Sequence, residues 1–240
     1  MLTAYETAVL ALIQAPSSPV PLITNPALDV YINTARGQVA GQGKCIRIYA
    51  TLTLTANVGS YPFSAIPFAA PAGVAGPNDV RMIWYQVGMG AGGTGQKLIA
   101  NQAFEWFAQY RLNNPVPGTG PPTEWAQLGQ GQFGTLFFDP VPDIPYVCPI
   151  DVECAPAPLV NDASPEAIPP LWQDAVPFYA AWLALQQLQR QADAEMMMKR
   201  FQELMSRARQ AATTDVLPDN FEGTPDLTLG NKLGATGKGG

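Results

Sequence analysis

The stretch Ile46-Arg-Ile-Tyr-Ala-Thr-Leu-Thr-Leu-Thr55 decides how the middle of this 240-residue chain folds. Apolar residues stand at every second position from Ile46 to Leu54, while arginine, tyrosine and threonine fill the positions between them. Successive side chains of a strand point to opposite faces, so this alternation predicts a β-strand with one buried face.

Helical patterns precede this strand. Thr3 and Glu6 have capping-box spacing ahead of an apolar run, which predicts a short first helix that Pro16 ends. A second helix is predicted to begin at Asn25-Pro26, because proline suits the first helical position, and to end at the glycines of residues 41–43.

The region after residue 55 is predicted to be rich in strands. Glycines from Gly129 to Gly134 indicate a hairpin turn, and residues 104–110 a short helix that Asn113-Asn114-Pro115 breaks. The further strands are expected at 60–63, 80–87, 123–128, 135–138 and 146–153. Because the strands cluster instead of alternating with helices, the α+β class is favoured over a parallel α/β sheet.

A long helix is predicted from about Ala175 to Ala212, after Ser164-Pro165-Glu166 opens a short turn. Asp174 is expected to cap it and to leave Pro177 in its first turn, where proline is tolerated. At ~1.5 Å per residue such a helix spans on the order of 50 Å. Its expected buried stripe is Val176, Tyr179, Leu183, Met197, Phe201, Leu204 and Ala208.

The composition limits the possible functions. Charged residues make up 13% of the chain, about half of the usual ~25%, so either neighbours cover much of the surface or it is simply rich in alanine, glutamine and threonine. The net charge of −6 argues against a sequence-specific nucleic-acid reader but not against a wall along which DNA slides. The absence of histidine excludes Ser-His-Asp and Cys-His catalysis and the commonest zinc ligands, so no enzyme activity, metal or cofactor is expected.

The cysteines and the N-terminus indicate an intracellular setting. Cys45, Cys148 and Cys154 lack CxxC spacing and are expected to be reduced, partly buried thiols. On one continuous strand, Cys148 and Cys154 would lie six residues apart on the same face, too distant to bond each other directly. The first residues lack the basic region of a signal peptide, and no apolar run reaches the ~18 residues of a membrane span.

Two glycine-rich patterns partly match the motifs of nucleotide sites. Gly88, Gly90 and Gly93 match GxGxxG after a predicted strand, but no helix pattern follows to receive a pyrophosphate. Gly90 and Gly95 with Lys97 approach a P-loop, yet the lysine is one residue late and a leucine follows it. A flexible hairpin tip or a partner-contacting loop is the preferred interpretation.

An acidic run offers a different possible site. Asp139, Asp143, Asp151 and Glu153 lie close in sequence, and the last two share one strand face, where they can hold a cation or act as paired carboxylates. The preferred interpretation is simpler: these residues form solvated turns and the rim of a strand.

The predicted long helix carries methionines and cations. Met196-Met197-Met198 cannot all face one side, because neighbours are about 100° apart, so at least one is expected to contact another helix or subunit. Lys199, Arg200, Arg207 and Arg209 either complement the dipole of the helix or dock an acidic partner surface.

The last residues, 213–240, are predicted to be an extended tail. They hold six glycines and two prolines with almost no apolar periodicity. Such a segment cannot bury enough apolar surface to offset roughly 1–2 kcal/mol of backbone entropy per residue, so we expect another molecule to order it. Its apolar anchors for that contact are Phe221, Leu227, Leu229 and Leu233.

Several motifs together are familiar. They are Leu28-Asp-Val-Tyr-Ile-Asn-Thr-Ala-Arg-Gly-Gln-Val-Ala40, Pro122-Thr-Glu-Trp125, Gly134-Thr-Leu-Phe-Phe-Asp-Pro-Val-Pro-Asp143, Pro158-Leu-Val-Asn-Asp162 and Ile168-Pro-Pro-Leu-Trp-Gln-Asp-Ala175. Their order resembles that of the head-to-tail adaptor (connector) proteins of tailed bacteriophages, especially short-tailed ones. The resemblance covers roughly residues 1–212 and consists of loose patterns of turns and aromatics; the glycine loop and the tail lie outside it.

The resemblance implies a helical bundle that carries a β-rich insertion, with helices at 1–43 packing on those at 161–212, an insertion at 44–160 and the tail at 213–240. It also implies a dodecameric ring beneath the portal protein, with tail proteins docked below and double-stranded DNA passing through the lumen.

We therefore expect a structural virion protein at the head–tail junction, assembled in the host cytoplasm, with no membrane partner. The alternatives are another virion component, such as a tail-tube or capsid-stabilising protein, and a nucleotide-binding enzyme that uses the Gly88 loop. The expected partner-interface residues are Arg207, Arg209, Phe221, Leu227, Leu229, Lys232 and Leu233.

Overall fold

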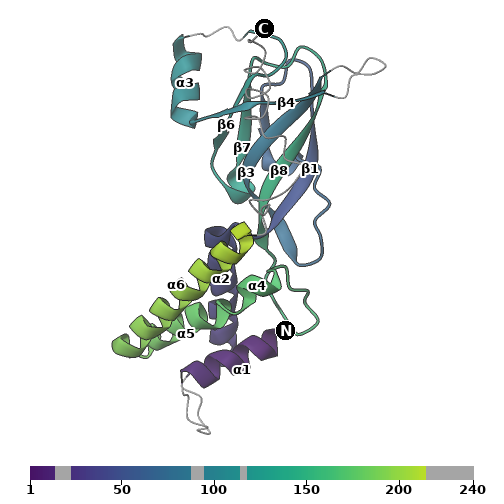
Figure 1. Cartoon of the computed structure of the whole chain (residues 1–240). Coiled ribbons are helices and arrows are strands. Elements are labelled where there is room, and N and C mark those ends of the chain that lie inside the picture. The colour runs from purple at the N-terminus through teal and green to yellow at the C-terminus, as the bar shows by residue number, and fades with distance from the viewer. Residues whose placement is uncertain (14–22, 88–94, 114–117, 215–240) are drawn as a thin grey trace, which may run out of the picture.

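The computed structural model describes residues 1–13, 23–87, 95–113 and 118–214. Figure 1 shows two units joined end to end, one of helices and one of strands. The helical unit consists of α1 (Leu2–Leu12), α2 (Asn25–Gly43), α4 (Pro170–Gln173), α5 (Val176–Gln187) and α6 (Gln191–Thr214). The chain is thus α+β, as the clustering of strands in the sequence predicted.

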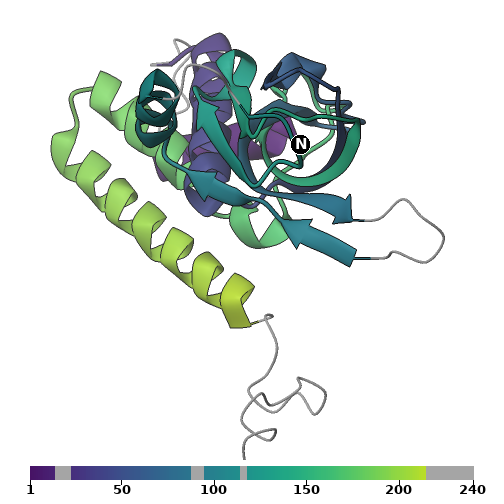
Figure 2. The same ribbon diagram turned by 90° about the horizontal axis from the view of Figure 1, so that it is seen from above.

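The helical unit is built around α5. Its residues Ala180, Ala181, Ala184 and Leu185 are all buried, because α1, α2 and α6 pack around this helix. Seen from above in Figure 2, α6 runs along the outside of the molecule. The N-terminal helices therefore pack on the C-terminal ones, with the strand unit inserted between them in sequence.

The predicted single helix from Ala175 to Ala212 is wrong, because the chain breaks between Gln187 and Gln191. Gln189 there has a left-handed backbone (φ 58°), and the N–H of Arg190 donates to Leu185 O at 3.0 Å. The break lets α6 fold back onto α5, which brings the Tyr179 and Phe201 rings to 5.0 Å between centroids. Because no glycine or proline marks the break, the sequence pattern ran through it.

The predicted buried stripe is shared between these two helices. Val176, Tyr179, Phe201 and Ala208 are buried, whereas Leu183, Met197 and Leu204 are half-buried against the same core.

Two predicted helix caps are also wrong. The first helix begins at Leu2, and Thr3 uses its hydroxyl to donate to the carboxylate of Asp162 instead of forming a capping box. The cap position of α5 is Ala175, without a side-chain cap, because Asp174 instead ends the short helix α4. The second helix, in contrast, starts and ends where the sequence predicted.

The strand unit contains two four-stranded sheets. The first has the order β1 (Arg47–Leu54), β8 (Tyr146–Pro156), β3 (Val74–Val87) and β4 (Gly95–Leu98), all antiparallel. The second has the order β2 (Ser60–Pro62), β7 (Thr135–Asp139), β6 (Glu124–Leu128) and β5 (Ala100–Gln102), with β5 and β6 parallel. Two single-turn helices, η1 (Phe63–Ala65) and η2 (Gly131–Phe133), and α3 (Phe104–Asn113) complete the unit.

All six predicted strands and the hairpin between β6 and β7 are confirmed, whereas β4, β5 and the first half of β3 were not predicted. In β1 the apolar face that alternation predicted carries buried Leu52 and Leu54, while Thr51 and Thr53 are exposed.

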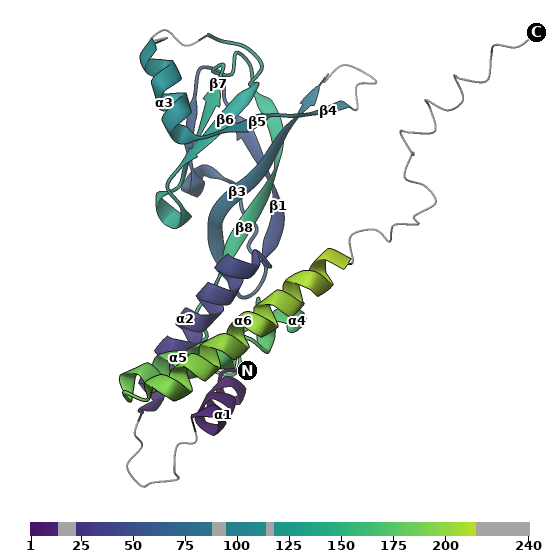
Figure 3. The same ribbon diagram turned by 60° about the vertical axis from the view of Figure 1, so that its left-hand side comes forward.

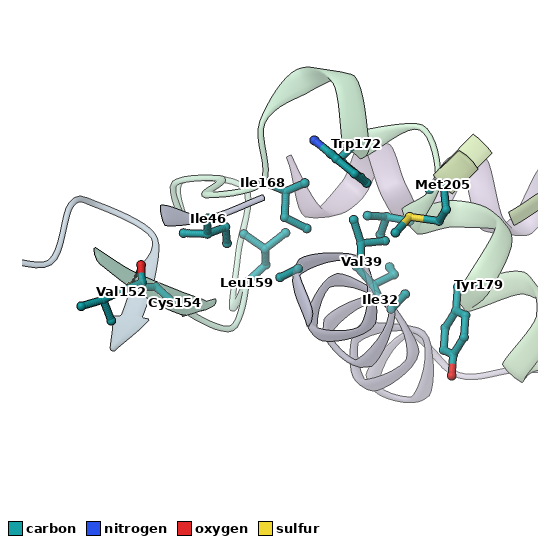
Figure 4. Packing of buried hydrophobic residues seen from close by; sticks show 14 of the residues in the cluster. Ile32, Val39, Ile46, Val152, Cys154, Leu159, Ile168, Trp172, Tyr179 and Met205 are labelled. Atoms are coloured by element: carbon teal, nitrogen blue, oxygen red, sulfur yellow. Dashed lines mark hydrogen bonds between the residues drawn. The ribbon is translucent and has the colours of Figure 1, made fainter. Parts of the chain in front are cut away.

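One continuous core crosses the junction between the units. Figure 4 shows Ile46 of the strand unit close to Leu159 and Ile168, which in turn adjoin Val39 of α2. None of the described helices combines the length and the apolar composition that crossing a bilayer requires.

Candidate functional site

A basic groove lies where the helical unit meets the first sheet. It has a volume of about 420 Å³ and is formed by the end of α2, the start of β1, the middle of β3, α4 and the last turns of α6. Figure 3 shows how these segments converge below the strands. Its lining residues are Gln42, Gly43, Lys44, Arg47, Arg81, Trp172, Arg209 and Ala212.

The end of α2 shapes one wall of the basic groove. A Cβ atom at Gly43 would lie 2.7 Å from a ring carbon of Trp172, so glycine is what allows the indole to pack this closely. Lys44 then adopts a left-handed conformation (φ 50°), and its N–H donates to Ala40 O at 2.8 Å. This turn ends the helix and directs the chain into β1.

Two buried carboxylates of β8 underlie the groove. Arg47 donates from Nε to Asp151 Oδ1 at 3.3 Å and pairs through Nη2 with the other oxygen, and these hydrogen bonds raise the pKa of Arg47. Lys44 Nζ and Arg81 Nε each lie 3.2 Å from Glu153 Oε1. Cations from α2, β1 and β3 therefore converge on one strand.

These contacts correct the prediction for the acidic run. Asp139, Asp151 and Glu153 are buried, not solvated, whereas Asp143 is exposed and accepts the hydroxyl of Tyr146 at 2.7 Å. Each buried carboxylate is paired with a cation instead of with another carboxylate. Within the described ranges, no group of three or more Cys, Asp or Glu is arranged to hold a metal ion.

The third buried carboxylate fixes α3 on the second sheet. Arg111 places Nη2 at 3.0 Å from Asp139 Oδ1 and donates to Phe138 O at 2.9 Å. Its guanidinium carbon also lies 5.3 Å from the ring centroid of Phe107. One arginine therefore joins the helix to the sheet through charge, a hydrogen bond and a ring contact.

Two of the predicted partner residues, Arg207 and Arg209, lie in the described part of the chain. Arg209 lines the basic groove and donates to Gln42 O at 3.1 Å, whereas Arg207 is exposed on α6 and does not line it. Lys199 is exposed, and Arg200 pairs with Glu203 on the same helix. The remaining predicted partner residues lie outside the described part of the chain: Phe221, Leu227, Leu229, Lys232 and Leu233.

The methionine triplet lies on α6 as the helical geometry requires. Met196 is exposed, whereas Met197 and Met198 are half-buried against the core. The prediction that the three cannot all face one side is confirmed.

Three cations of the basic groove were not predicted as site residues from the sequence: Lys44, Arg47 and Arg81. Arg47 does stand on the polar side of the predicted strand, which is a weak signal. Nothing in the sequence indicates, however, that β8 lies between β1 and β3, and only that order places all three cations over Asp151 and Glu153.

The glycine-rich patterns fall between two paired strands in the sequence. Residues 88–94 are outside the described ranges, but β3 before them pairs antiparallel with β4 after them, so a strand and not a helix begins at Gly95. Lys97 belongs to that strand. The helix that a dinucleotide site or a P-loop needs is therefore replaced by β4.

The cysteines are buried or half-buried thiols. Cys148 and Cys154 are buried in β8, and Cys45 is half-buried between α2 and β1; none of the three forms a disulfide. Burial raises the pKa of Cys45 to about 11 and those of Cys148 and Cys154 to about 12. Such thiols are poor nucleophiles near neutral pH, which agrees with a structural position.

An apolar hollow of about 580 Å³ opens on the helical unit, away from the basic groove. It lies between α1, α4, α5 and α6. Half-buried apolar side chains, among them Leu12, Phe178 and Leu204, form much of its wall, and Gln173, Asp174 and Arg200 also line it. A hollow with such walls fits an apolar side chain or helix better than a polar ligand.

Comparison with known proteins adds no assignment. A scan against protein-family models finds none that matches the chain, and a search of curated proteins finds no matching relative.

Proposed function

We propose that this chain is the subunit of a ring that joins the portal of a tailed bacteriophage to its tail and lets DNA pass. The observation that carries the proposal is the apolar hollow between α1, α5 and α6. In a free monomer these apolar walls stay partly exposed to water. A neighbouring copy that covered them would stabilise the assembly by about 25 cal/mol for each Å² of apolar surface buried.

Exposed apolar residues elsewhere support an assembled state. Leu112, Phe133 and Val160 are exposed on three different segments, and Trp106 stacks on Tyr110 on the outer side of α3. Only 13% of the residues are charged, so there is little charge to keep these surfaces apart in solution.

The proposed partners are assigned to different parts of the chain. Neighbouring copies meet at the apolar hollow, the portal takes residues 213–240, and the strand unit with α3 faces the tail proteins. The DNA meets a chain of net charge −6, which repels phosphate and prevents tight binding. The proposed location is accordingly the head–tail junction of the virion.

Measuring the mass of the purified protein tests the proposal. The monomer has a mass of 25.6 kDa, and a dodecamer has twelve times that mass. Native mass spectrometry, alone and with the portal protein, is expected to detect the ring in at least one condition. A 25.6-kDa species under both conditions would refute ring formation, and electron microscopy that located the protein in the tail tube or on the capsid would favour the alternative virion roles.

Two variants separate the parts of the proposal. Ala8→Arg fills part of the hollow with a long side chain and adds a second cation to the one that Arg200 already supplies, so it is expected to abolish the ring while leaving the helical content unchanged. Gln202→Arg, on an exposed part of α6 that does not line the hollow, is the matched control and is expected to assemble normally.

A chain that ends after Ala212 is expected to fold but to bind the portal more weakly; unchanged portal affinity would rule out the proposed role of the tail.

A further inference from the structure

The basic groove has more hydrogen-bond donors than its carboxylates use. An ammonium group carries three N–H donors and a guanidinium five. Lys44 and Arg81 each contact the same oxygen, Glu153 Oε1, which accepts no well-directed hydrogen bond. Both side chains are partly exposed, so N–H groups of Lys44 and Arg81 remain available to a second anion from solvent.

The formal charge of the groove is positive, although the chain is acidic. Lys44, Arg47, Arg81 and Arg209 contribute four positive charges, and the two carboxylates beneath remove two. Asp79 on β3 lines a separate hollow on the side of the second sheet. The groove is therefore a cationic site in a protein of net charge −6, and it favours an anionic occupant.

The sequence directly after α6 has the complementary charge. Residues 215–226 read Asp-Val-Leu-Pro-Asp-Asn-Phe-Glu-Gly-Thr-Pro-Asp, with four carboxylates and no lysine or arginine. We propose that the basic groove binds this acidic stretch of its own chain.

The position of the stretch favours this contact. Ala212 lines the groove and α6 ends at Thr214, so Asp215 follows within a few residues of the site. At ~3.4 Å per extended residue, twelve residues reach about 40 Å, which is ample to cross the groove. A short tether also gives the stretch an effective concentration in the millimolar range, far above that of a free competitor.

Helix electrostatics favour the same contact. A carboxylate next to a helix C-terminus is unfavourable, because the helix dipole is negative there. Asp215 directly follows the last residue of α6. The cations of the basic groove offset that repulsion if the stretch lies across them.

Duplex DNA fits the groove less well than a peptide does. The groove has a volume of about 420 Å³, enough for part of one extended peptide strand, whereas the rigid cylinder of a duplex can only touch the rim. The proposal concerns the isolated chain and does not depend on the ring or on the portal.

The test uses full-length protein in which the stretch is neutralised by Asp215→Asn, Asp219→Asn, Glu222→Gln and Asp226→Asn. A fluorescent peptide of residues 215–226 is titrated against this variant and against the unmodified chain, with anisotropy as the readout. The variant is expected to bind the peptide at least tenfold more tightly, because the unmodified chain already fills its groove. Added salt is expected to weaken this binding.

Three comparisons make the test decisive. The neutral Asn/Gln version of the peptide is expected not to bind. In the neutralised variant, the further change Arg81→Gln is expected to lower the affinity for the acidic peptide several-fold. Equal peptide affinity for the variant and the unmodified chain would overturn the proposal, as would tighter binding of a 12-base-pair duplex than of the peptide. Carbodiimide cross-linking in a mixture of isotope-labelled and unlabelled chains gives a separate check, since Lys44 cross-links that join two different chains would also overturn it.

Discussion

The buried ion pair between Arg36 and Glu166 supports a quantitative prediction. Arg36 of α2 is 1% exposed and Glu166, in the segment that returns from β8, is 5% exposed. The guanidinium donates from Nη2 to Glu166 Oε1 at 2.7 Å and from Nε to both carboxylate oxygens at 3.1–3.2 Å. Its Nη1 donates to Ala157 O at 2.7 Å and to Asn33 Oδ1 at 3.1 Å.

Replacing Glu166 with glutamine keeps the shape of the side chain but removes its charge. Breaking one side of a buried pair costs about 3–5 kcal/mol, because the remaining charge is left without its counter-ion. Arg36 keeps two acceptors, Asn33 and Ala157, so we expect the lower end, about 3 kcal/mol. With a urea m-value of about 3 kcal/mol/M, the unfolding midpoint should fall by about 1 M.

Urea unfolding followed by circular dichroism measures this loss. The matched control is Glu203→Gln, which removes the partner of Arg200 in a surface pair whose side chains are 45% and 44% exposed. Such pairs contribute about 0–1 kcal/mol, so the control should unfold close to the unmodified protein. If Glu166→Gln lost no more stability than Glu203→Gln, the reasoning from burial would be refuted.

Three further predictions concern single positions. Gly43→Ala should lower the free energy of unfolding, measured with urea, by about 1–3 kcal/mol, because the new Cβ would lie 2.7 Å from the Trp172 ring. The control Gly41→Ala, whose Cβ would have nothing within 4 Å, should leave this free energy unchanged or raise it. Gln189→Gly should raise the melting temperature, because the left-handed backbone at this position costs a non-glycine residue about 1–2 kcal/mol and costs glycine little. In an unbroken helix the same change would lower the melting temperature. Burial raises the pKa of Cys148 from 9.0 to about 12. The stabilisation that the protonated thiol contributes is therefore complete below pH 9 and is lost as the pH rises towards 12. In Cys148→Ala, the free energy of unfolding should fall less steeply with pH between 9 and 12.

Local patterns in the sequence predicted much of the fold. Alternation from Ile46 to Leu54 gave the strand and its buried face, and Asn25-Pro26 with the later glycines gave both ends of α2. These features depend on residues close together in the chain. The break at Gln189 did not follow from the sequence, because it arises from the packing of α6 on α5 and not from a helix-breaking residue.

The candidate site was less predictable than the fold. Arg209 was singled out and does line the basic groove, but the other cations there, Lys44, Arg47 and Arg81, come from parts of the chain more than a hundred residues away. The carboxylates Asp151 and Glu153 were expected to be solvated, since sequence alone does not reveal that Arg47 and Arg81 lie on the strands either side of them. Long-range sheet order, and not residue type, decided their burial.

The contacts at the junction between the two units hold the helical unit and the strand unit together. The strand unit leaves and rejoins the helical unit at adjacent points, because Arg47 pairs with Glu153 across the sheet and Cys154 donates its N–H to Ile46 O at 2.9 Å. The returning segment is then held by Arg36 through Ala157. An apolar core and the Lys44–Glu153 ion pair therefore cross the same boundary, and bending there would disturb both. A subunit that connects two different proteins, as proposed here, has to transmit force between them without bending, and this junction is built to resist that motion.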